Sequence, residues 1–212
     1  MKKLILSILS FGILFATQAV AQQRIYVCEG FRYDVHEVRS TDDIVFSADG
    51  LELSIGDLDT YELDDIDSIT FAEPQFPRVD IRFDGASATV NVGAGVKGVT
   101  YKVQGANVTL TSTTTSEEYL YSVSGTSTNG SLVINGEYKL SVELAGLTLT
   151  NPNGPAIDVE CGKRIGVILK EGTVNTLADG KVGTHKGAFY TEGHPEFEGG
   201  GTLNVTGNTK HA

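Results

Sequence analysis

The sequence predicts an all-β protein in which a parallel β-helix follows a small β-module. Twenty-five glycines and frequent Val and Thr favour strands joined by many corners. Three segments repeat one pattern, an alternating apolar strand, a glycine and a second short strand with Thr or Asn: residues 140–151, 165–177 and 195–205. Their glycines Gly146, Gly172 and Gly201 recur at spacings of 26 and 29 residues. Such a period is typical of a solenoid whose units bury their apolar faces by stacking.

An antiparallel β-sandwich is the alternative, because it also produces many short strands separated by frequent turn signals. The junctions at Asn151–Pro155 and Ala178–Lys181 favour the β-helix, since they are typical of open corners more than of tight type I′ turns. Parallel strands need no two-residue hairpin, so these corners agree with strands that run in the same direction.

Five motifs, in order along the chain, carry a resemblance: Tyr121–Gly125, Ala156–Lys163, Gly172–Asp179, Lys186–Tyr190 and Gly199–Asn208. Over roughly residues 79–212 the sequence resembles the bacterial carbohydrate-binding-domain proteins. This resemblance implies a right-handed parallel β-helix similar to that of polysaccharide lyases. It also implies binding of acidic plant polysaccharide such as polygalacturonate, binding of cellulose, and bound calcium. Family membership indicates a fold more firmly than a function.

The N-terminal residues 1–21 are typical of a secretory signal peptide. Two lysines precede an apolar core at residues 4–15, and Ala19-Val-Ala21 is a small-residue cleavage site. No other stretch approaches the ~20 apolar residues that a bilayer span needs. We therefore expect a mature chain that starts near Gln22, has no transmembrane segment and is secreted to the periplasm or the cell surface.

The distribution of charge indicates a domain boundary at Pro77. Residues 22–77 hold 14 Asp and Glu against 3 Arg, whereas residues 78–212 hold 13 acids against 11 bases. The stretch Glu73-Pro-Gln-Phe-Pro77 is typical of a stiff linker. We expect a small acidic N-terminal module over residues 22–77 and the β-helix domain over residues 78–212.

The N-terminal module is expected to be a small antiparallel β-unit. The segment Asp65–Phe71 is similar to a short element near the start of many secreted bacterial envelope proteins. We predict that four apolar residues pack its core, namely Leu63, Ile66, Ile69 and Phe71. Three acids between them are expected to form a solvated face, namely Asp64, Asp65 and Asp67.

The first strands of the second domain are predicted from alternation. Residues 79–83 and 87–92 alternate as half-buried strands around a turn at Asp84-Gly85, and further strands follow within residues 98–111. The sequence stops at Asn208–Ala212, in what looks like the middle of a coil. Since terminal solenoid repeats carry a polar cap, we expect an incomplete, C-terminally truncated β-helix.

The net charge of −11 argues against a nucleic-acid partner, whose phosphates would be repelled. A protein of this charge meets an acidic polysaccharide only through local basic groups or bridging cations, which favours calcium. Calcium takes six to eight oxygen ligands, and stacked coils bring equivalent positions about 4.8 Å apart. Asp158, Asp179 and Glu196 are the candidate calcium ligands, with Glu160 on the coil of Asp158.

The segment from His185 to Glu196 holds the richest mixture of His, base, acid and aromatic residues. We expect four of its residues to contact polysaccharide: His185, Lys186, Tyr190 and His194. The two histidines are nine residues apart without a Cys or a matching third ligand, so the spacing does not indicate a zinc site.

The leading interpretation is a secreted, non-catalytic carbohydrate-binding protein. A pectate-type polysaccharide lyase is the alternative, and it would need a carboxylate cluster that holds calcium beside a Lys or Arg base. A structural, adhesin-like envelope protein without sugar affinity is a third possibility. No residue is singled out as catalytic, because no base in the sequence is set beside a carboxylate cluster. Cys28 and Cys161 lie in different modules, and Cys161 is expected to be a small buried residue.

Overall fold

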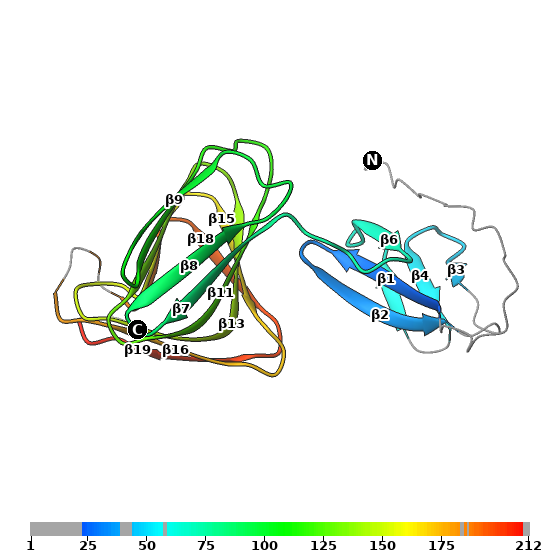
Figure 1. Cartoon of the computed structure of the whole chain (residues 1–212). Helices are drawn as coiled ribbons and strands as arrows, with labels where there is room; N and C mark the ends of the chain where they lie inside the picture. The colour runs from blue at the N-terminus through cyan, green and yellow to red at the C-terminus, as the bar shows by residue number, and fades with distance from the viewer. Residues whose placement is uncertain (1–22, 39–43, 57–58, 183–184, 186, 210–212) are drawn as a thin grey trace, which may run out of the picture. The chain divides into compact units, whose positions relative to one another are not determined.

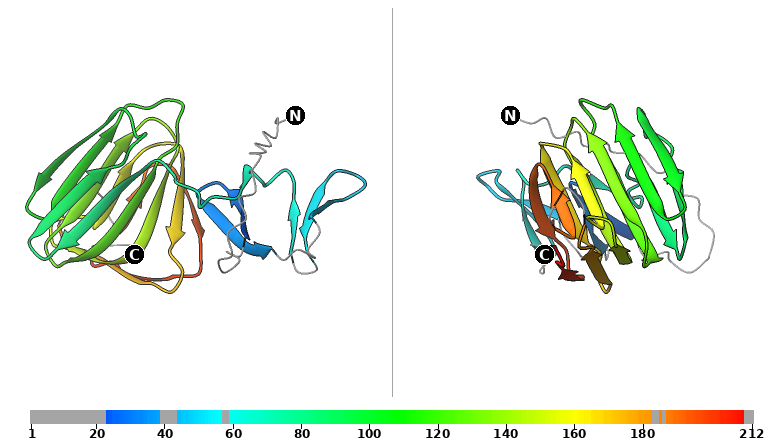
Figure 2. Two further views of the ribbon diagram at one scale, coloured as in Figure 1. Left: turned by 45° about the vertical axis from the view of Figure 1, so that its right-hand side comes forward. Right: turned by 90° about the vertical axis from the view of Figure 1, so that its left-hand side faces the viewer.

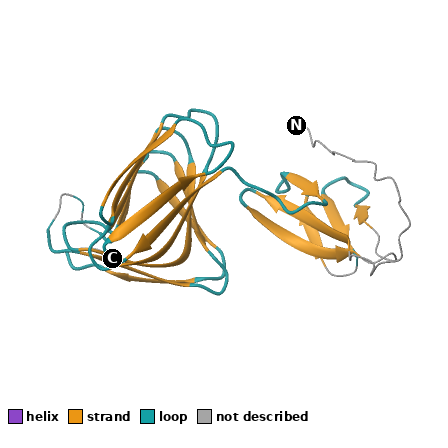
Figure 3. Ribbon diagram, in the orientation of Figure 1, coloured by secondary structure: helices purple, strands orange, loops and turns teal. Residues whose placement is uncertain are grey.

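The computed structural model describes residues 23–38, 44–56, 59–182, 185 and 187–209. The predicted signal peptide and Lys186 lie outside these described residues. The chain forms two units, the first ending at Gln75 and the second beginning at Phe76. Every regular element in the described part of both units is a strand, which confirms the all-β prediction (Figure 3). Within that part, no helix is long and apolar enough to cross a membrane.

The first unit consists of two three-stranded antiparallel sheets (Figure 1). One sheet has the order β2-β1-β6, with β1 Gln23–Glu29, β2 Arg32–Val38 and β6 Ser68–Thr70. The other has the order β3-β4-β5, with β3 Ile44–Phe46, β4 Glu52–Ile55 and β5 Asp59–Glu62.

A small apolar cluster fills the first unit, formed by Ile25, Val27, Leu53, Ile55, Tyr61 and Ile66, with Leu63 and Ile69 packed against it. Three of the four predicted core residues therefore pack as expected. The prediction for Phe71 is wrong: its side chain is 56% exposed, because β6 ends at Thr70 and the chain leaves the sheet there. The three acids between the core positions are exposed, as predicted.

The second unit begins with two antiparallel pairs of strands. β7 (Arg78–Asp84) pairs with β8 (Ser87–Val92), and Asp84 lies opposite Ser87 across the turn. β9 (Val99–Gln104) pairs in the same way with β10 (Asn107–Ser112). The hairpin predicted around Asp84-Gly85 is thus confirmed, and Gly85 adopts a φ of 60° in its turn, a conformation that favours glycine.

The strands that follow pair only in parallel. They are β11 Leu120–Ser127, β12 Ser131–Gly136, β13 Leu140–Asn151, β14 Ile157–Glu160, β15 Arg164–Leu169, β16 Val174–Asp179, β17 Phe189–Thr191, β18 His194–Glu198 and β19 Thr202–Thr206. They build three ladders: β7-β11-β13-β15-β18, β10-β12-β14-β17 and β13-β16-β19. Figure 2 shows the strands of these ladders side by side. The three repeated segments therefore stack in parallel register, which differs from the antiparallel sandwich considered as the alternative.

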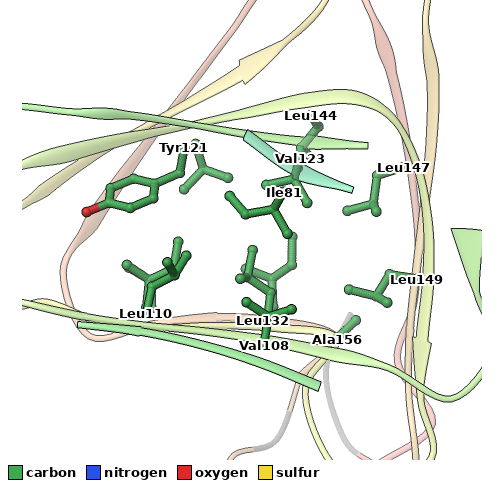
Figure 4. Close-up of a cluster of buried hydrophobic side chains, with 14 of the residues drawn as sticks. Ile81, Val108, Leu110, Tyr121, Val123, Leu132, Leu144, Leu147, Leu149 and Ala156 are labelled. Carbon is green, nitrogen blue, oxygen red and sulfur yellow. The ribbon is translucent and has the colours of Figure 1, made fainter. Parts of the chain in front are cut away.

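The core of the second unit lies between the ladders (Figure 4). Alternate side chains of each strand point inward, so that Val79, Tyr121, Val142 and Val167 form one buried row across β7, β11, β13 and β15. Val108 and Leu132 enter the same cluster from β10 and β12, as Figure 4 shows. Burial of each such side chain contributes about 1.5–3 kcal/mol, so the rows fix which residues face outward.

Cys161 is 1% exposed and belongs to this core, as predicted. Its thiol donates a hydrogen bond to the Tyr138 carbonyl oxygen at 3.2 Å. Cys28 is buried in the first unit, and both cysteines are free.

One corner of the second unit is held by Asn175, whose side chain is fully buried at the start of β16. Its Oδ1 accepts hydrogen bonds from the backbone N–H groups of Gly146 and Leu147, at 3.0 and 2.9 Å. Its Nδ2 donates to the Thr202 carbonyl oxygen at 3.2 Å. One side chain therefore links the neighbouring passages of the chain at β13 and β19.

Candidate functional site

Two carboxylates project from the outer face of β14, because successive side chains of a strand point to opposite faces. Ile157 and Val159 are fully buried, so Asp158 and Glu160 between and after them point away from the core. The Asp158 side chain is 15% exposed and that of Glu160 is 28% exposed. The sequence Ile-Asp-Val-Glu thus places two acidic groups on one face, within reach of solvent.

An aromatic residue from the next strand lies beside these acids. β17 pairs in parallel with β14, and Tyr190 is the register partner of Asp158. The imidazole ring of His185, from the segment before β17, stacks on the Tyr190 ring with centroids 3.9 Å apart and an interplanar angle of 16°. The stack positions the imidazole next to the two carboxylates.

His185 contacts both acids through one nitrogen. Its Nδ1 lies 3.0 Å from Asp158 Oδ2 and 3.4 Å from Glu160 Oε1. The other oxygen of Asp158, Oδ1, is buried and has no hydrogen-bond partner among the described residues. One ligand atom from each of the three residues lies within 4.8 Å of the others. The group, which we call the Asp158 cluster (Asp158, Glu160 and His185), is therefore compact enough to share one ion.

Polar side chains continue from the Asp158 cluster along the outer face of the sheet. Asn135 of β12 is the register partner of Glu160, and Thr111 of β10 is the partner of Asn135. Val133 and Thr109 form the neighbouring row, next to Asp158. This face offers amide and hydroxyl groups around a partly exposed aromatic pair, a combination suited to a polar ligand with apolar ring faces.

The residues predicted to bind polysaccharide have different positions. His185 and Tyr190 are brought together by stacking. Lys186 lies outside the described residues. His194 is exposed at the start of β18, which belongs to another sheet, so it does not join the other two.

The three predicted calcium ligands do not form one group. Asp158 joins Glu160 and His185, whereas Asp179 ends β16 and Glu196 lies on β18. Glu196 is exposed, and its Oε2 lies 3.7 Å from Arg164 Nη1. Each acid belongs to a different ladder, and Asp179 is buried, so the three carboxylates do not converge.

Asp179 has a structural role in the described part of the chain. Its carboxylate accepts hydrogen bonds from the backbone N–H groups of Asn208 and Thr209 and from the Thr209 hydroxyl. Burial acts to raise the pKa of this carboxyl, but the hydrogen bonds outweigh it and hold the pKa below its ordinary value. Asp179 therefore fixes the segment that follows β19.

Arg164, an arginine that could serve as the base of a lyase, is engaged elsewhere. Its Nη2 donates to both carboxylate oxygens of Glu118, at 2.8 and 2.7 Å. Lys139 Nζ lies 3.2 Å from the same carboxylate, and the Ser141 hydroxyl donates to it at 2.8 Å. These contacts join β13 and β15 to Glu118, two residues before β11, and leave Arg164 away from the Asp158 cluster.

The contact of His185 with Asp158 and Glu160 was not predicted from the sequence, because only the spacing between His185 and His194 was considered. A usable signal exists, because His185 follows Asp158 by 27 residues, close to the spacings of 26 and 29 residues between the repeated glycines. In a fold of stacked repeats, residues one period apart lie on or near neighbouring strands.

Comparisons with known proteins identify the family of this chain. No curated protein matches the chain significantly. A solved structure, that of a polysaccharide lyase-like protein from C. thermocellum in a gadolinium derivative, is similar at 21% identity with a TM-score of 0.48. The match covers 59% of this chain and 51% of that one, so the chain spans about half the length of that protein. The sequence model of the carbohydrate-binding domain-containing proteins matches residues 104–212, which is more than half of the chain. The chain belongs to the family of carbohydrate-binding domain-containing proteins.

Proposed function

We propose that this protein is a secreted, non-catalytic polysaccharide-binding protein. The observation that carries the proposal is the family match over residues 104–212, a region that includes every residue of the Asp158 cluster and Tyr190. Secretion is supported by the signal-peptide pattern of residues 1–21.

We also infer that the second unit is a right-handed parallel β-helix. Three parallel ladders, to which successive passages of the chain each add a strand, support this interpretation. Crossovers between parallel strands of one sheet are right-handed in nearly all proteins, which supports the handedness. Such a fold presents long flat outer faces, and a polymer can lie across several strands of one face.

The outer face of β10, β12, β14 and β17 is the proposed polysaccharide surface. The stacked pair of Tyr190 and His185 would pack against the apolar face of a sugar ring, and Asn135 and Thr111 would hydrogen-bond to hydroxyl groups. Each contact contributes little, but a polymer repeats its units, so several weak contacts add to useful retention.

An acidic polysaccharide such as polygalacturonate is the proposed ligand class, with calcium as a bridging ion. The second domain holds 13 acids against 11 bases, so its net charge of −2 repels a polyanion much less than the −11 of the whole chain suggests. The carboxylates of Asp158 and Glu160 would still repel uronate groups directly. A calcium ion held mainly by uronate oxygens, on the sheet face beside the Asp158 cluster and not within it, would offset this repulsion.

The contacts of the basic residues favour binding over lyase chemistry. A lyase needs a Lys or Arg base beside the carboxylates that hold calcium. In the described residues, the basic side chain paired with Asp158 and Glu160 is His185, and Arg164 is held by Glu118.

The test is retention of the mature chain, from Gln22 to Ala212, on insoluble polygalacturonate and on cellulose, with calcium and with chelator. We expect calcium-dependent retention on polygalacturonate. Tyr190→Ala should weaken retention about five- to thirtyfold, corresponding to about 1–2 kcal/mol. Tyr101→Ala is the matched control, because Tyr101 is 52% exposed on β9, away from β14 and β17 in the strand order of the sheet.

Three outcomes would contradict the proposal or the surface it names. A well-folded chain that is retained on neither polymer, in either buffer, would exclude polysaccharide binding of this kind. Release of unsaturated uronide absorbance from polygalacturonate would instead identify a lyase. Equal losses in Tyr190→Ala and Tyr101→Ala would place the binding surface elsewhere.

A further inference from the structure

We propose that Asp158, Glu160 and His185 bind a divalent transition-metal ion of the zinc class. This inference does not depend on the polysaccharide ligand, since it rests on the contacts of the Asp158 cluster alone. Three residues from two neighbouring passages of the chain meet at one point on the outer face of the sheet, and each supplies a different ligand atom.

The distances within the cluster fit a small ion. Zinc bonds to nitrogen and oxygen at about 2.0–2.2 Å in a tetrahedron, which places neighbouring ligand atoms about 3.3 Å apart. His185 Nδ1 lies 3.0 Å from Asp158 Oδ2 and 3.4 Å from Glu160 Oε1. All three ligand atoms lie within 4.8 Å of one another, so small side-chain rotations bring the set to a common ion.

The unpaired oxygen of Asp158 is a second, independent observation. Oδ1 is buried and has no hydrogen-bond partner in the described part of the chain. A buried carboxylate oxygen without a partner is destabilising, and native proteins satisfy nearly all such atoms. A cation bound at this carboxylate would offset that cost.

The donor set selects the class of metal. Calcium takes six to eight oxygens, whereas the cluster offers two carboxylates and an imidazole nitrogen. Imidazole nitrogen together with carboxylate oxygen suits zinc and related transition metals. The two negative charges also balance a divalent ion, so the occupied site would be close to neutral.

The surroundings allow an ion to enter and keep the imidazole in place. The side chains of His185 and Glu160 are 29% and 28% exposed, so the site opens to solvent. Stacking on Tyr190 restrains the plane of the His185 ring, and a restrained ligand loses less entropy when an ion binds. Three protein ligands leave a fourth position for water.

The experiment is calorimetric titration of the tag-free mature chain with zinc after treatment with chelator, followed by calcium in a separate titration. We expect one zinc ion per chain, bound more tightly than calcium. His185→Gln should weaken zinc binding at least tenfold, and Glu160→Gln should weaken it to a similar extent. His194→Gln is the matched control and should bind zinc as the unmodified chain does, because His194 lies on the exposed start of β18.

A spectroscopic measurement keeps the test independent of folding effects. Cobalt(II) bound in place of zinc should give the intense visible bands of four-coordinate geometry in the unmodified chain and in His194→Gln, and lose them in His185→Gln, with far-UV circular dichroism unchanged. Three results would overturn the proposal: absence of zinc binding in the folded chain, unaltered zinc binding in His185→Gln, or calcium bound more tightly than zinc. Polysaccharide retention is measured separately, so its failure would leave these results interpretable.

Discussion

Replacement of Asn175 by Ala tests how much the hydrogen bonds of this buried side chain stabilise the second unit. Asn175 Oδ1 accepts hydrogen bonds from the backbone N–H groups of Gly146 and Leu147, and its Nδ2 donates one to the Thr202 carbonyl oxygen. Alanine makes none of these bonds, and no other side chain of the described residues bonds to those two N–H groups. The segments β13, β16 and β19 would therefore lose their shared link while their strand pairing stays in place.

The magnitude follows from burial. Leu147 is fully buried, so its unpaired N–H costs about 1–3 kcal/mol, whereas the exposed Gly146 recovers part of its bond from water. Loss of the buried amide also leaves a small cavity. We expect the free energy of unfolding of the second unit to fall by about 2–4 kcal/mol.

Urea unfolding followed by circular dichroism measures this loss, and hydrogen exchange reports the Leu147 amide directly. A loss of about 3 kcal/mol lowers protection by about two powers of ten. Asn204→Ala is the control, because Asn204 is exposed on β19, and it should change stability by less than about 0.5 kcal/mol. If Asn175→Ala and Asn204→Ala unfold at the same urea concentration, the corner does not depend on the buried amide.

Two further predictions follow from burial and titration. Asp179 has a pKa below its ordinary value, so its stabilising effect is present above the unfolded-state pKa of about 3.9 and is lost as the pH falls through the folded-state pKa. Urea midpoints measured from about pH 6 to about pH 2.5 should therefore fall less steeply in Asp179→Asn than in the unmodified chain; equal slopes would contradict this account. Leu144→Ala should cost about 2–5 kcal/mol because Leu144 is fully buried, whereas Phe71→Ala, at a side chain 56% exposed, should stay within about 0.5 kcal/mol in the same assay.

Much of the fold could be predicted because alternation and period are properties of the sequence. The alternation of residues 79–83 and 87–92 was enough to predict the β7–β8 hairpin, and the spacing of the glycines indicated that residues 140–151 and 165–177 stack. Phe71 could not be placed, because its exposure depends on where β6 ends, which no local pattern shows.

The candidate site was predicted less completely. The sequence indicated that Asp158 and Glu160 belong to the same coil, but the direction in which each acid points depends on which of three ladders its strand joins. Asp179 and Glu196 are acids at the ends or on the faces of other ladders, so they do not reach Asp158. The role of Asp179 depends on Asn208 and Thr209, which arrive from the segment after β19.

The order of strand pairing predicts an order of folding along the chain. Asp84 pairs with Ser87 within one hairpin, whereas Arg78 must wait for Leu120 before β7 gains its parallel partner. Short loops close faster than long ones, so the β7–β8 and β9–β10 hairpins should form first and act as templates. Each later strand then adds to an edge that already exists. Assembly of the second unit would thus grow in one direction, from its N-terminal hairpins onward, in the order in which the ribosome supplies the chain.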